Sequence, residues 1–297
     1  MKELEKQFDE IISRALEEDL GQGGDVTTDA LINDEWQGKA DFLIKGEGIL
    51  AGIEIARRVF LKVDNEVDVR IMVQDGNKIK PGDIVASVSG KLASILKSER
   101  TSLNFLQRLS GIASETARYV AAVQGLPVKI LDTRKTTPGL RYLEKYAVKV
   151  GGGQNHRMNL GDGILIKDNH LEALYSHGAS LKEAVLKARR NSPKELRVEV
   201  ETKTIEEVIQ AVEAGADIIM LDNMSADMMR QAVKIIKGRA LVEASGNINM
   251  NNVRIVAETG VDFISVGALT HSVKSLDISL EFKKETPNKY YEQRPIN

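Results

Sequence analysis

Short apolar runs alternate with longer helical patterns in the second half of the chain. Runs of strand-forming residues fall at 128–133, 163–168, 196–201, 217–222, 240–245 and 262–267. Patterns with helical spacing separate most of them, most clearly at 204–214 and 226–237. Strand–helix alternation with short links predicts parallel strands joined by right-handed crossovers. Six runs are fewer than the eight strands of a closed barrel. We therefore predict an α/β fold with an incomplete, open α/β barrel, and an open doubly wound sheet is the alternative.

The first half has a different rhythm, in which short strands and glycine-rich turns lie between helices. We predict helices over 3–18, 52–62 and 95–123, and strands over 36–50 and 67–73. Gly111 either breaks the third helix or lets another backbone approach it. The change of rhythm predicts two domains. A small sheet domain covers 1–112, with 275–297 packing back on it, and the barrel domain covers 113–274.

The 297-residue chain is ordinary in composition, with 42% hydrophobic and 28% charged residues and a net charge of −2. Such a chain has no global positive field, so we expect no nucleic-acid partner. It has no cysteine, which excludes disulfides, thiolate catalysis and cysteine-bound zinc. The start, MKELEKQFDE, lacks the apolar segment of a signal peptide, and no stretch approaches the roughly 18 apolar residues of a membrane helix. We expect a cytoplasmic protein without a membrane partner.

The predicted strands of the second half turn polar or small at their carboxyl ends. In a barrel these ends converge on one mouth, where the loops carry the ligand chemistry. The cationic or potentially cationic side chains at these ends, or in the loop after the glycine triplet, are Arg134, Lys135, His156, Arg157 and Lys167. Arginine binds carboxylate or phosphate by paired hydrogen bonds, and lysine supplies a point charge. In a nearly neutral protein, this cluster predicts a local site for a small, highly anionic ligand.

Carboxylates and small residues complete the predicted mouth. Glu201 and Asp222 end successive strands, where they can accept hydrogen bonds from sugar hydroxyls, hold Mg²⁺ or stabilise a developing cation. Ser245-Gly246-Asn247 and Ser265-Val266-Gly267 follow the last strands, where small residues let backbone N–H groups point at phosphate oxygens. His271 either reaches this phosphate loop or caps a helix. Together these groups predict a phosphorylated sugar that reacts with a second, carboxylated molecule.

Some of these residues admit other interpretations. Lys167 at a strand end could form a Schiff base with a carbonyl substrate, as in a lyase. His156 could act as a base, although Arg157 beside it favours a role as hydrogen-bond donor. Glu199 and Glu201 alternate along one strand, and we expect them to face opposite sides, with Glu201 at the mouth. A protein that binds anions without turnover is a further alternative.

A series of distinct motifs extends along nearly the whole chain. They include Glu18-Asp19-Leu20-Gly21, Glu99-Arg100-Thr101, Asp132-Thr133-Arg134-Lys135-Thr136-Thr137-Pro138-Gly139, Asn155-His156-Arg157, Ile166-Lys167-Asp168-Asn169-His170, Val198-Glu199-Val200-Glu201, Leu221-Asp222-Asn223, Glu243-Ala244-Ser245-Gly246 and Ser265-Val266-Gly267-Ala268. This series resembles the quinolinate phosphoribosyltransferase family, also called carboxylating nicotinate-nucleotide pyrophosphorylases. Asn247 is a departure, because many members of that family have a second glycine there.

The resemblance implies an N-terminal α/β sandwich domain, an open α/β barrel, and a homodimer or larger assembly whose sites lie between subunits. Members of the family transfer phosphoribosyl from 5-phosphoribosyl 1-pyrophosphate (PRPP) to the nitrogen of quinolinate, with Mg²⁺ as cofactor. Pyrophosphate and CO₂ leave, and nicotinate mononucleotide forms on the way to NAD. The resemblance also covers relatives that have the same site but another acceptor and are grouped with molybdenum transport operons.

The resemblance assigns roles to the matching residues. Those that would hold the two carboxylates of quinolinate and the phosphates of PRPP are Arg134, Lys135, His156, Arg157 and Lys167, and Thr133 would also bind substrate. Arg100 would enter the site from the partner subunit. Glu201 and Asp222 would bind the ribose hydroxyls and Mg²⁺, partly through the substrate, and with Lys135 they would be the catalytic residues. The 5′-phosphate would be bound by Ser245, Gly246, Asn247, Ser265, Val266 and Gly267, with His271 close by.

Overall fold

The computed structural model describes residues 2–283, which fall into two compact units. One comprises the residues up to Gly111 and those from Ser275 onward, and the other comprises Ile112–Lys274. Helix α4 (Leu92–Ala122) runs from the first into the second. It is continuous at Gly111, so of the two alternatives for this glycine a break in the helix is excluded; a single glycine costs a helix only about 1 kcal/mol relative to alanine. Residues 284–297, part of the segment predicted to pack back, lie outside the described residues.

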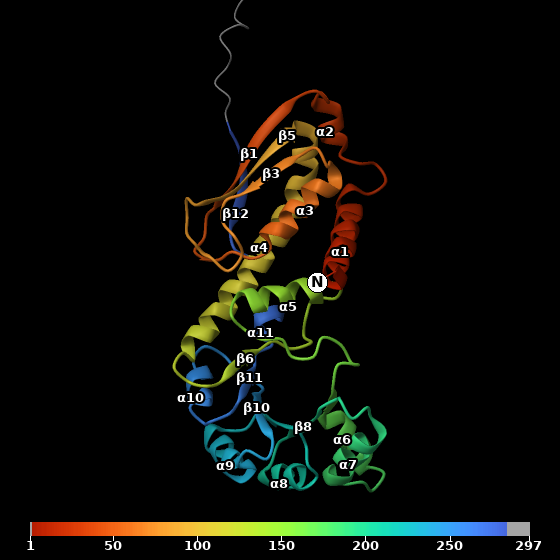
Figure 1. The fold of residues 1–297 in the computed structure, drawn as a ribbon, viewed down its shortest axis with the longest axis vertical. Helices are drawn as coiled ribbons and strands as arrows, with labels where there is room; N and C mark the ends of the chain where they lie inside the picture. Colours follow the sequence, from red (N-terminus) through yellow and green to blue (C-terminus); the bar gives the residue numbers. More distant parts are fainter. Residues whose placement is uncertain (1, 284–297) are drawn as a thin grey trace, which may run out of the picture. The chain divides into compact units, whose positions relative to one another are not determined.

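The first unit is built on a four-stranded antiparallel sheet with the order β12-β1-β5-β3 (Figure 1). Its strands are β1 (Gln37–Ile44), β3 (Asp68–Ile71), β5 (Ile84–Lys91) and β12 (Ile278–Phe282). A smaller sheet pairs β2 (Gly48–Ile49) with β4 (Lys78–Ile79). The helices are α1 (Lys2–Leu20), α2 (Val26–Leu31), α3 (Ile53–Val63) and the first part of α4. The predicted sheet domain thus takes its last strand from the distant end of the chain.

The core of this unit lies between one face of the sheet and its helices. The apolar side chains of Ala40, Phe42 and Ile44 on β1 are buried, and Phe42 meets Phe60 of α3 edge to face, with ring centroids 6.0 Å apart. The start of α3 is held by a carboxylate from another turn, because the backbone N–H groups of Gly52 and Ile53 donate to Asp75 at 2.7 and 3.0 Å. Such a cap satisfies N–H groups that have no partner within the helix.

The second unit contains a six-stranded parallel sheet. Its strands are β6 (Lys129–Leu131), β7 (Ile164–Ile166), β8 (Val198–Thr202), β9 (Ile218–Asp222), β10 (Leu241–Ser245) and β11 (Phe263–Ser265). The order is β6-β11-β10-β9-β8-β7, which follows the chain and then wraps β6 against the last strand. A doubly wound sheet would instead reverse its order at a switch point. The predicted open α/β barrel is confirmed, with the opening between β6 and β7.

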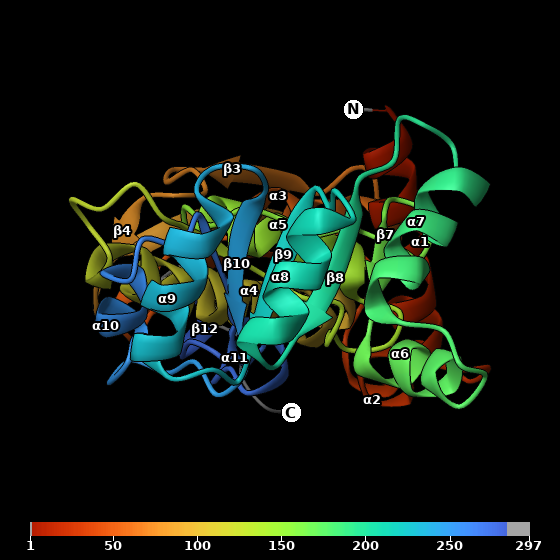
Figure 2. The same ribbon diagram turned by 90° about the horizontal axis from the view of Figure 1, so that it is seen from below.

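Helices alternate with the strands. They are α5 (Arg141–Val150), α6 (Asp168–Tyr175), α7 (Leu181–Asn191), α8 (Ile205–Glu213), α9 (Ala226–Ile236), α10 (Val253–Ala257) and α11 (Ala268–His271). Of these, α8 and α9 lie over one face of the sheet (Figure 2). Helix α8 packs against β8 and β9, and α9 packs against β10. Over residues 2–283, no helix combines the length and the apolar character needed to cross a membrane.

A loop occupies the place beside β6 that a further strand would fill. Gln154 forms a parallel bridge with Leu131, and its backbone makes two hydrogen bonds to the end of β6, with N···O distances of 2.8 and 3.1 Å. The preceding glycines let this loop pack closely. A Cβ on Gly151 or Gly153 would lie 2.4 or 2.8 Å from atoms of α4, closer than any side chain can come. The loop therefore enters the barrel at a fixed place.

Candidate active site at the mouth of the barrel

A cavity of about 620 Å³ opens at the carboxyl ends of the parallel strands. Its lining residues are Thr133, Arg134, Lys135, His156, Arg157, Leu165, Lys167, Asp168, Asn169, Glu201, Met220, Asp222, Asn223, Glu243, Ser245, Gly246, Asn247 and Ser265. Every one of the six parallel strands contributes a residue from its end or from the loop that follows it. The geometry thus brings most of the predicted site residues to one mouth, while their individual roles remain predictions.

The predicted residues outside this lining have different positions. Val266 is buried. A Cβ on Gly267 would lie 3.0 Å from the ring of His271 and 3.2 Å from the side chain of Lys135, so these three residues are neighbours beside the cavity. Arg100 is exposed on α4, in the part of the helix that belongs to the first unit. Its predicted entry into a partner's site therefore stays a prediction.

Two adjacent arginines dominate the cationic side of the cavity. Nε of Arg134 is buried and has no hydrogen-bond partner among the described residues. Arg157 donates from Nη1 to the carbonyl oxygen of Gly163 at 2.9 Å. Burial and the neighbouring charge of Arg134 lower the pKa of Arg157. Because an unpaired buried donor is costly, this pair favours binding of an anion.

Two carboxylates face this cationic side from the ends of β8 and β9. Glu201 accepts a hydrogen bond at 3.0 Å from the backbone N–H of Asp168. Burial raises the pKa of Glu201, and the charge of Asp222 adds to that effect, while Lys167 opposes it. Two carboxylates that repel each other in this way are suited to share a hydroxyl-bearing ligand or a divalent cation.

The turn after β10 depends on a glycine and an asparagine. The φ angles of Gly246 and Asn247 are 90° and 51°, in the left-handed region. A Cβ on Gly246 would lie 2.3 Å from Oδ1 of Asn223, so another residue there would have to displace that side chain and would be strained at this φ angle. Asparagine tolerates left-handed backbone better than most residues, which explains why it can replace a glycine at 247. Its side chain donates to Oδ1 of Asn223 at 2.9 Å.

A buried hydrogen-bonded cluster, which we did not predict, forms the floor of the cavity. Nε2 of His156 lies 3.2 Å from the carboxylate of Glu199 and 3.5 Å from that of Glu243, and Ser265 donates its hydroxyl to Glu243. Burial disfavours a charged ring, but the two carboxylates outweigh it and raise the pKa of His156 to about 10. The backbone N–H of Arg157 donates to Nδ1 and opposes a second proton. The two carboxylates therefore hold a proton on Nε2 and favour the charged ring, whereas the N–H of Arg157 works against it.

The expectation that Glu199 and Glu201 face opposite sides of β8 is wrong. Residues two apart on a strand project from the same face, and here that face is the barrel interior. Glu243 and Ser245 repeat the arrangement on β10. Because residues two apart on a strand share a face, the sequence alone could have placed Glu199 with Glu201, and Glu243 with Ser245, inside the barrel. Oε1 of Glu199 is buried without a partner among the described residues, and this side chain lines a second cavity of about 420 Å³.

Within the described residues, this cluster is also the group of three histidine and acidic side chains whose spacing could hold a metal ion. The ligand atoms of His156, Glu199 and Glu243 all lie within 4.8 Å of one another. Glu201 and Asp222, which we predicted to hold Mg²⁺, offer two carboxylates at the cavity wall. A magnesium ion bound there would need further oxygen ligands from substrate or water, as Mg²⁺ sites at phosphate-binding centres commonly do.

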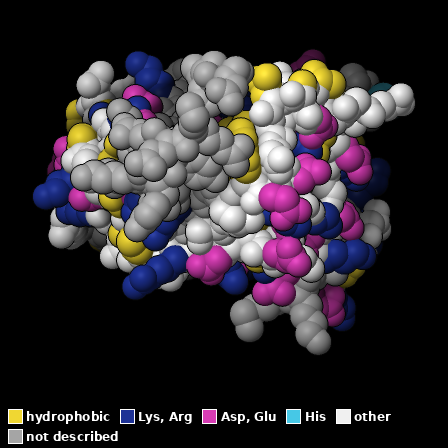
Figure 3. Space-filling model, turned by 90° about the horizontal axis from the view of Figure 1, so that it is seen from above, with side chains coloured by type: hydrophobic (Ala, Val, Ile, Leu, Met, Phe, Trp, Pro, Cys, Tyr) yellow, Lys and Arg dark blue, Asp and Glu magenta, His cyan; other side chains and the backbone are white. Residues whose placement is uncertain are grey.

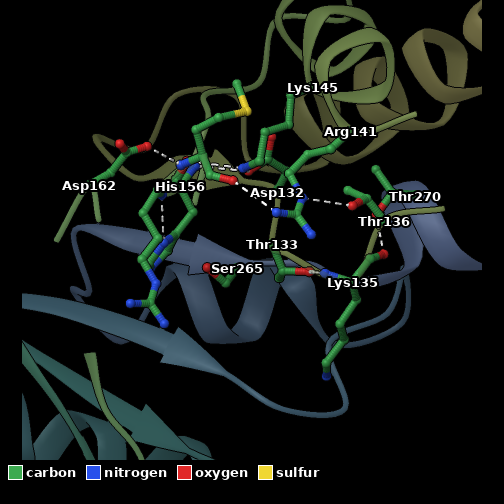
Figure 4. A network of polar contacts seen from close by, with 12 residues as sticks. Asp132, Thr133, Lys135, Thr136, Arg141, Lys145, His156, Asp162, Ser265 and Thr270 are labelled. Carbon is green, nitrogen blue, oxygen red and sulfur yellow. Dashed lines mark hydrogen bonds and ion pairs between the residues drawn. The ribbon is translucent and has the colours of Figure 1, made fainter. Parts of the chain in front are cut away.

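A buried ion pair lies beneath the cationic loops (Figure 4). Nζ of Lys145 contacts the carboxylate of Asp132, and both side chains are fully buried. Burial raises the pKa of Asp132 to about 6, against the attraction of Lys145, and burial lowers the pKa of Lys145. We did not single out either residue for a role in the sequence, since a lysine within a helical pattern is normally exposed.

At the mouth of this barrel, cations lie across one cavity from paired carboxylates, an arrangement suited to a phosphorylated, strongly anionic ligand. Family comparison gives the class of protein. Residues 112–281 match the model of the quinolinate phosphoribosyl transferase C-terminal domain, and residues 25–110 match that of the N-terminal domain. The chain belongs to the quinolinate phosphoribosyltransferase family.

Individual relatives agree over nearly the whole chain. A protein of Nicotiana glauca named quinolinate phosphoribosyltransferase (decarboxylating) 2, mitochondrial, is 44% identical over 291 residues, which cover 93% of this chain and 82% of the relative. A probable nicotinate-nucleotide pyrophosphorylase (carboxylating) of Bacillus subtilis is 42% identical and covers 93% of both chains. The crystal structure of NadC from Streptococcus pyogenes has a TM-score of 0.88 and 44% identity, covering 93% of this chain and 95% of that one.

Proposed function

We propose that this protein transfers phosphoribosyl from PRPP to the ring nitrogen of quinolinate, releasing pyrophosphate and CO₂ and forming nicotinate mononucleotide for NAD biosynthesis. The observation that carries the proposal is the single cavity in which cations from β6, β7 and the 154–157 loop face carboxylates from β8 and β9. The names of relatives that are 42–44% identical support the same reaction.

The cationic side suits an acceptor with two carboxylates. Arg134 and Arg157 offer forked guanidinium groups, which can each pair with a carboxylate through two hydrogen bonds. The unpaired Nε of Arg134 supplies a donor that such a ligand would satisfy. Lys135 and Lys167 are exposed at the same mouth and add point charges for the phosphates of PRPP. An exposed Lys167 also lacks the dry surroundings that activate a lysine for Schiff-base chemistry.

The carboxylate side suits the ribose and its developing charge. When the C1′–O bond to pyrophosphate breaks, positive charge appears on the ribose ring. The carboxylates of Glu201 and Asp222 would accept hydrogen bonds from the ribose hydroxyls and favour that charge. The backbone N–H groups of Gly246 and Asn247 would hold the 5′-phosphate. Fixing both reactants in line accounts for much of the expected rate gain.

The decarboxylation step follows from the transfer itself. Once the acceptor nitrogen has bonded to C1′, the ring is a pyridinium. The bond from the adjacent ring carbon to its carboxylate then breaks and CO₂ leaves. The electron pair stays on that carbon beside the positive nitrogen and takes up a proton. The chain's own task is to bind the acceptor with that carboxylate freed for departure and the other held by cations.

We also propose Mg²⁺ as cofactor, a homodimer and a cytoplasmic location. The paired carboxylates of Glu201 and Asp222 fit a divalent cation shared with substrate oxygens, where the ion would neutralise the charge of the leaving pyrophosphate. The exposed position of Arg100 suits the role of a cation supplied to a second subunit. On the face in Figure 3, acidic and basic side chains of the described residues lie side by side.

The test is incubation of the purified protein with quinolinate, PRPP and Mg²⁺, following nicotinate mononucleotide and CO₂ together. Equal amounts of both products, lost when EDTA is added, support the proposal. Nicotinate in place of quinolinate is the matched control, since it has one carboxylate fewer. Retained PRPP binding with no product from quinolinate would point to another acceptor, and turnover of nicotinate would contradict the two-carboxylate interpretation.

A further inference from the structure

The buried pair of Asp132 and Lys145 lies beside the two segments that bring cations to the cavity, residues 133–135 and 154–157. Asp132 follows the last residue of β6 and precedes Thr133, Arg134 and Lys135 in the chain. Lys145 comes from the middle of α5. Neither side chain lines the cavity within the described part of the chain. The pair can therefore affect a ligand only through the segments that it holds.

The pair binds the backbone of His156 from both directions (Figure 4). The N–H of His156 donates to Oδ1 of Asp132 at 2.8 Å, and Nζ of Lys145 donates to the carbonyl oxygen of His156 at 3.0 Å. With its amide oriented to match its neighbours, Asn155 donates to Oδ2 of Asp132 at 3.0 Å and to the carbonyl oxygen of Lys145 at 2.9 Å. Charged partners thus bind both the N–H and the carbonyl oxygen of His156. Because Arg157 is the next residue, its backbone is held in place as well.

Energetics distinguish this arrangement from ordinary packing. Removing two charges from water costs several kcal/mol per ion, and well-packed apolar residues in place of a buried pair are often neutral or stabilising. Apolar residues, however, could not donate to or accept from the backbone of residue 156. What the ion pair adds beyond volume is a set of directed hydrogen bonds to the loop in the opening between β6 and β7.

We propose that Asp132 and Lys145 are positioning residues that hold the 154–157 loop so that His156 and Arg157 meet the acceptor. This rests on the proposed function, because the acceptor is taken to be a dicarboxylate bound on the cationic side. Among the described residues, the pair makes no hydrogen bond or ion pair with Lys135, Glu201, Asp222 or the 245–247 turn, which would hold PRPP. Loosening the loop should therefore weaken acceptor binding and leave PRPP binding nearly unchanged.

The test compares Lys145→Met, Asp132→Asn and the double variant in the full-length protein. Each single variant leaves one buried charge unpaired and is expected to lower the melting temperature. The double variant leaves none and should recover most of that loss. We expect the double variant to keep a KM for quinolinate raised about tenfold or more, with PRPP affinity within about twofold, since small displacements of binding groups are costly. Lys182→Met with Glu213→Gln, an exposed pair at 3.0 Å in the same unit, is the matched control.

The proposed reaction and the positioning role of Asp132 and Lys145 can fail separately. Wild-type protein that neither binds nor converts quinolinate would defeat the proposed function. Active wild type, with a double variant that is stable and has unchanged quinolinate KM, would show that the pair is only structural and would overturn this inference. Equal weakening of quinolinate and PRPP would also overturn it, because a general disturbance of the barrel would explain that result.

Discussion

Glu199 and Glu201 project from the same face of β8, two residues apart, yet their carboxylates have different partners. Glu199 lies 3.2 Å from Nε2 of His156 in the barrel floor, and Glu201 accepts from the N–H of Asp168 at the rim. Burial and the nearby Glu243 raise the pKa of Glu199 to about 7. One strand thus supplies an internal partner for a histidine and a carboxylate for the ligand.

Replacement of Glu201 by glutamine should abolish most activity and spare the fold. Glutamine can still accept the hydrogen bond from Asp168, but it carries no charge to stabilise a cationic transition state. We expect kcat to fall about 10²–10³-fold, the range found when a preorganised electrostatic group is removed. Circular dichroism should be unchanged. Glu206→Gln, at an exposed position of α8, is the control and should retain full activity.

Replacement of Arg134 by lysine should weaken acceptor binding although the charge is kept. Lysine cannot form the paired hydrogen bonds of a guanidinium, and the position of the buried Nε would lose its donor. Hydrogen bonds to charged groups contribute about 1.5–3 kcal/mol, which corresponds to a KM for quinolinate raised roughly 10–100-fold. Arg230→Lys on α9 provides the comparison. An unchanged KM in Arg134→Lys would remove this arginine from the acceptor site.

Stability should decline as the pH rises from about 5 toward 10, and Glu199→Gln should reduce that slope. In the folded protein, the pKa of Glu199 is raised to about 7 and that of His156 to about 10. Both groups therefore bind protons more tightly folded than unfolded. The contribution of His156 is complete below its unfolded pKa, near 6.5, and is lost as the pH passes through about 10. Urea titrations of both proteins across this range would measure the difference, which we expect to be about 1 kcal/mol or more. Parallel curves would contradict the linkage.

We expect substitutions at the adjacent positions 246 and 247 to differ in how much stability they cost. Gly246→Ala places a Cβ 2.3 Å from Oδ1 of Asn223 at a φ of 90°, so we expect a loss of about 1–3 kcal/mol and weaker PRPP binding. Asn247→Gly removes only a hydrogen bond to Asn223 and a left-handed asparagine, and stability should change by less than about 1 kcal/mol. Thermal denaturation and PRPP titration of the two variants provide the check. Equal losses in both would show that the turn does not depend on its glycine.

The barrel and its mouth could be predicted because local signals determine them. Apolar runs that stop at polar residues define parallel strands, and the carboxyl ends of such strands converge without any knowledge of side-chain packing. Lys135, Lys167, Glu201 and Asp222 reach the cavity for that reason alone. The resemblance to a known family supplied the substrates and the individual roles, which strand ends by themselves do not specify.

The interior contacts could not be predicted in the same way. The pairing of Asp132 with Lys145 joins residues 13 positions apart on a strand end and a helix, and the helical pattern gives no sign that this lysine is buried. His156 reaches Glu199 and Glu243 across the barrel, contacts that depend on where the 154–157 loop enters. The error at Glu199 was of another kind, because strand periodicity alone was sufficient to place it correctly.

The opening between β6 and β7 has a consequence for how this scaffold can diversify. In a closed barrel, a paired strand would fill the place beside β6, and an insertion within it would shift its register with two neighbours. Here the loop at 151–163 sits in the opening, and only Gln154 takes part in the ladder. Insertions after Arg157 would leave every strand pair intact. We therefore expect acceptor preference to change through segments in this opening while the strands that would bind phosphoribosyl keep their pairing.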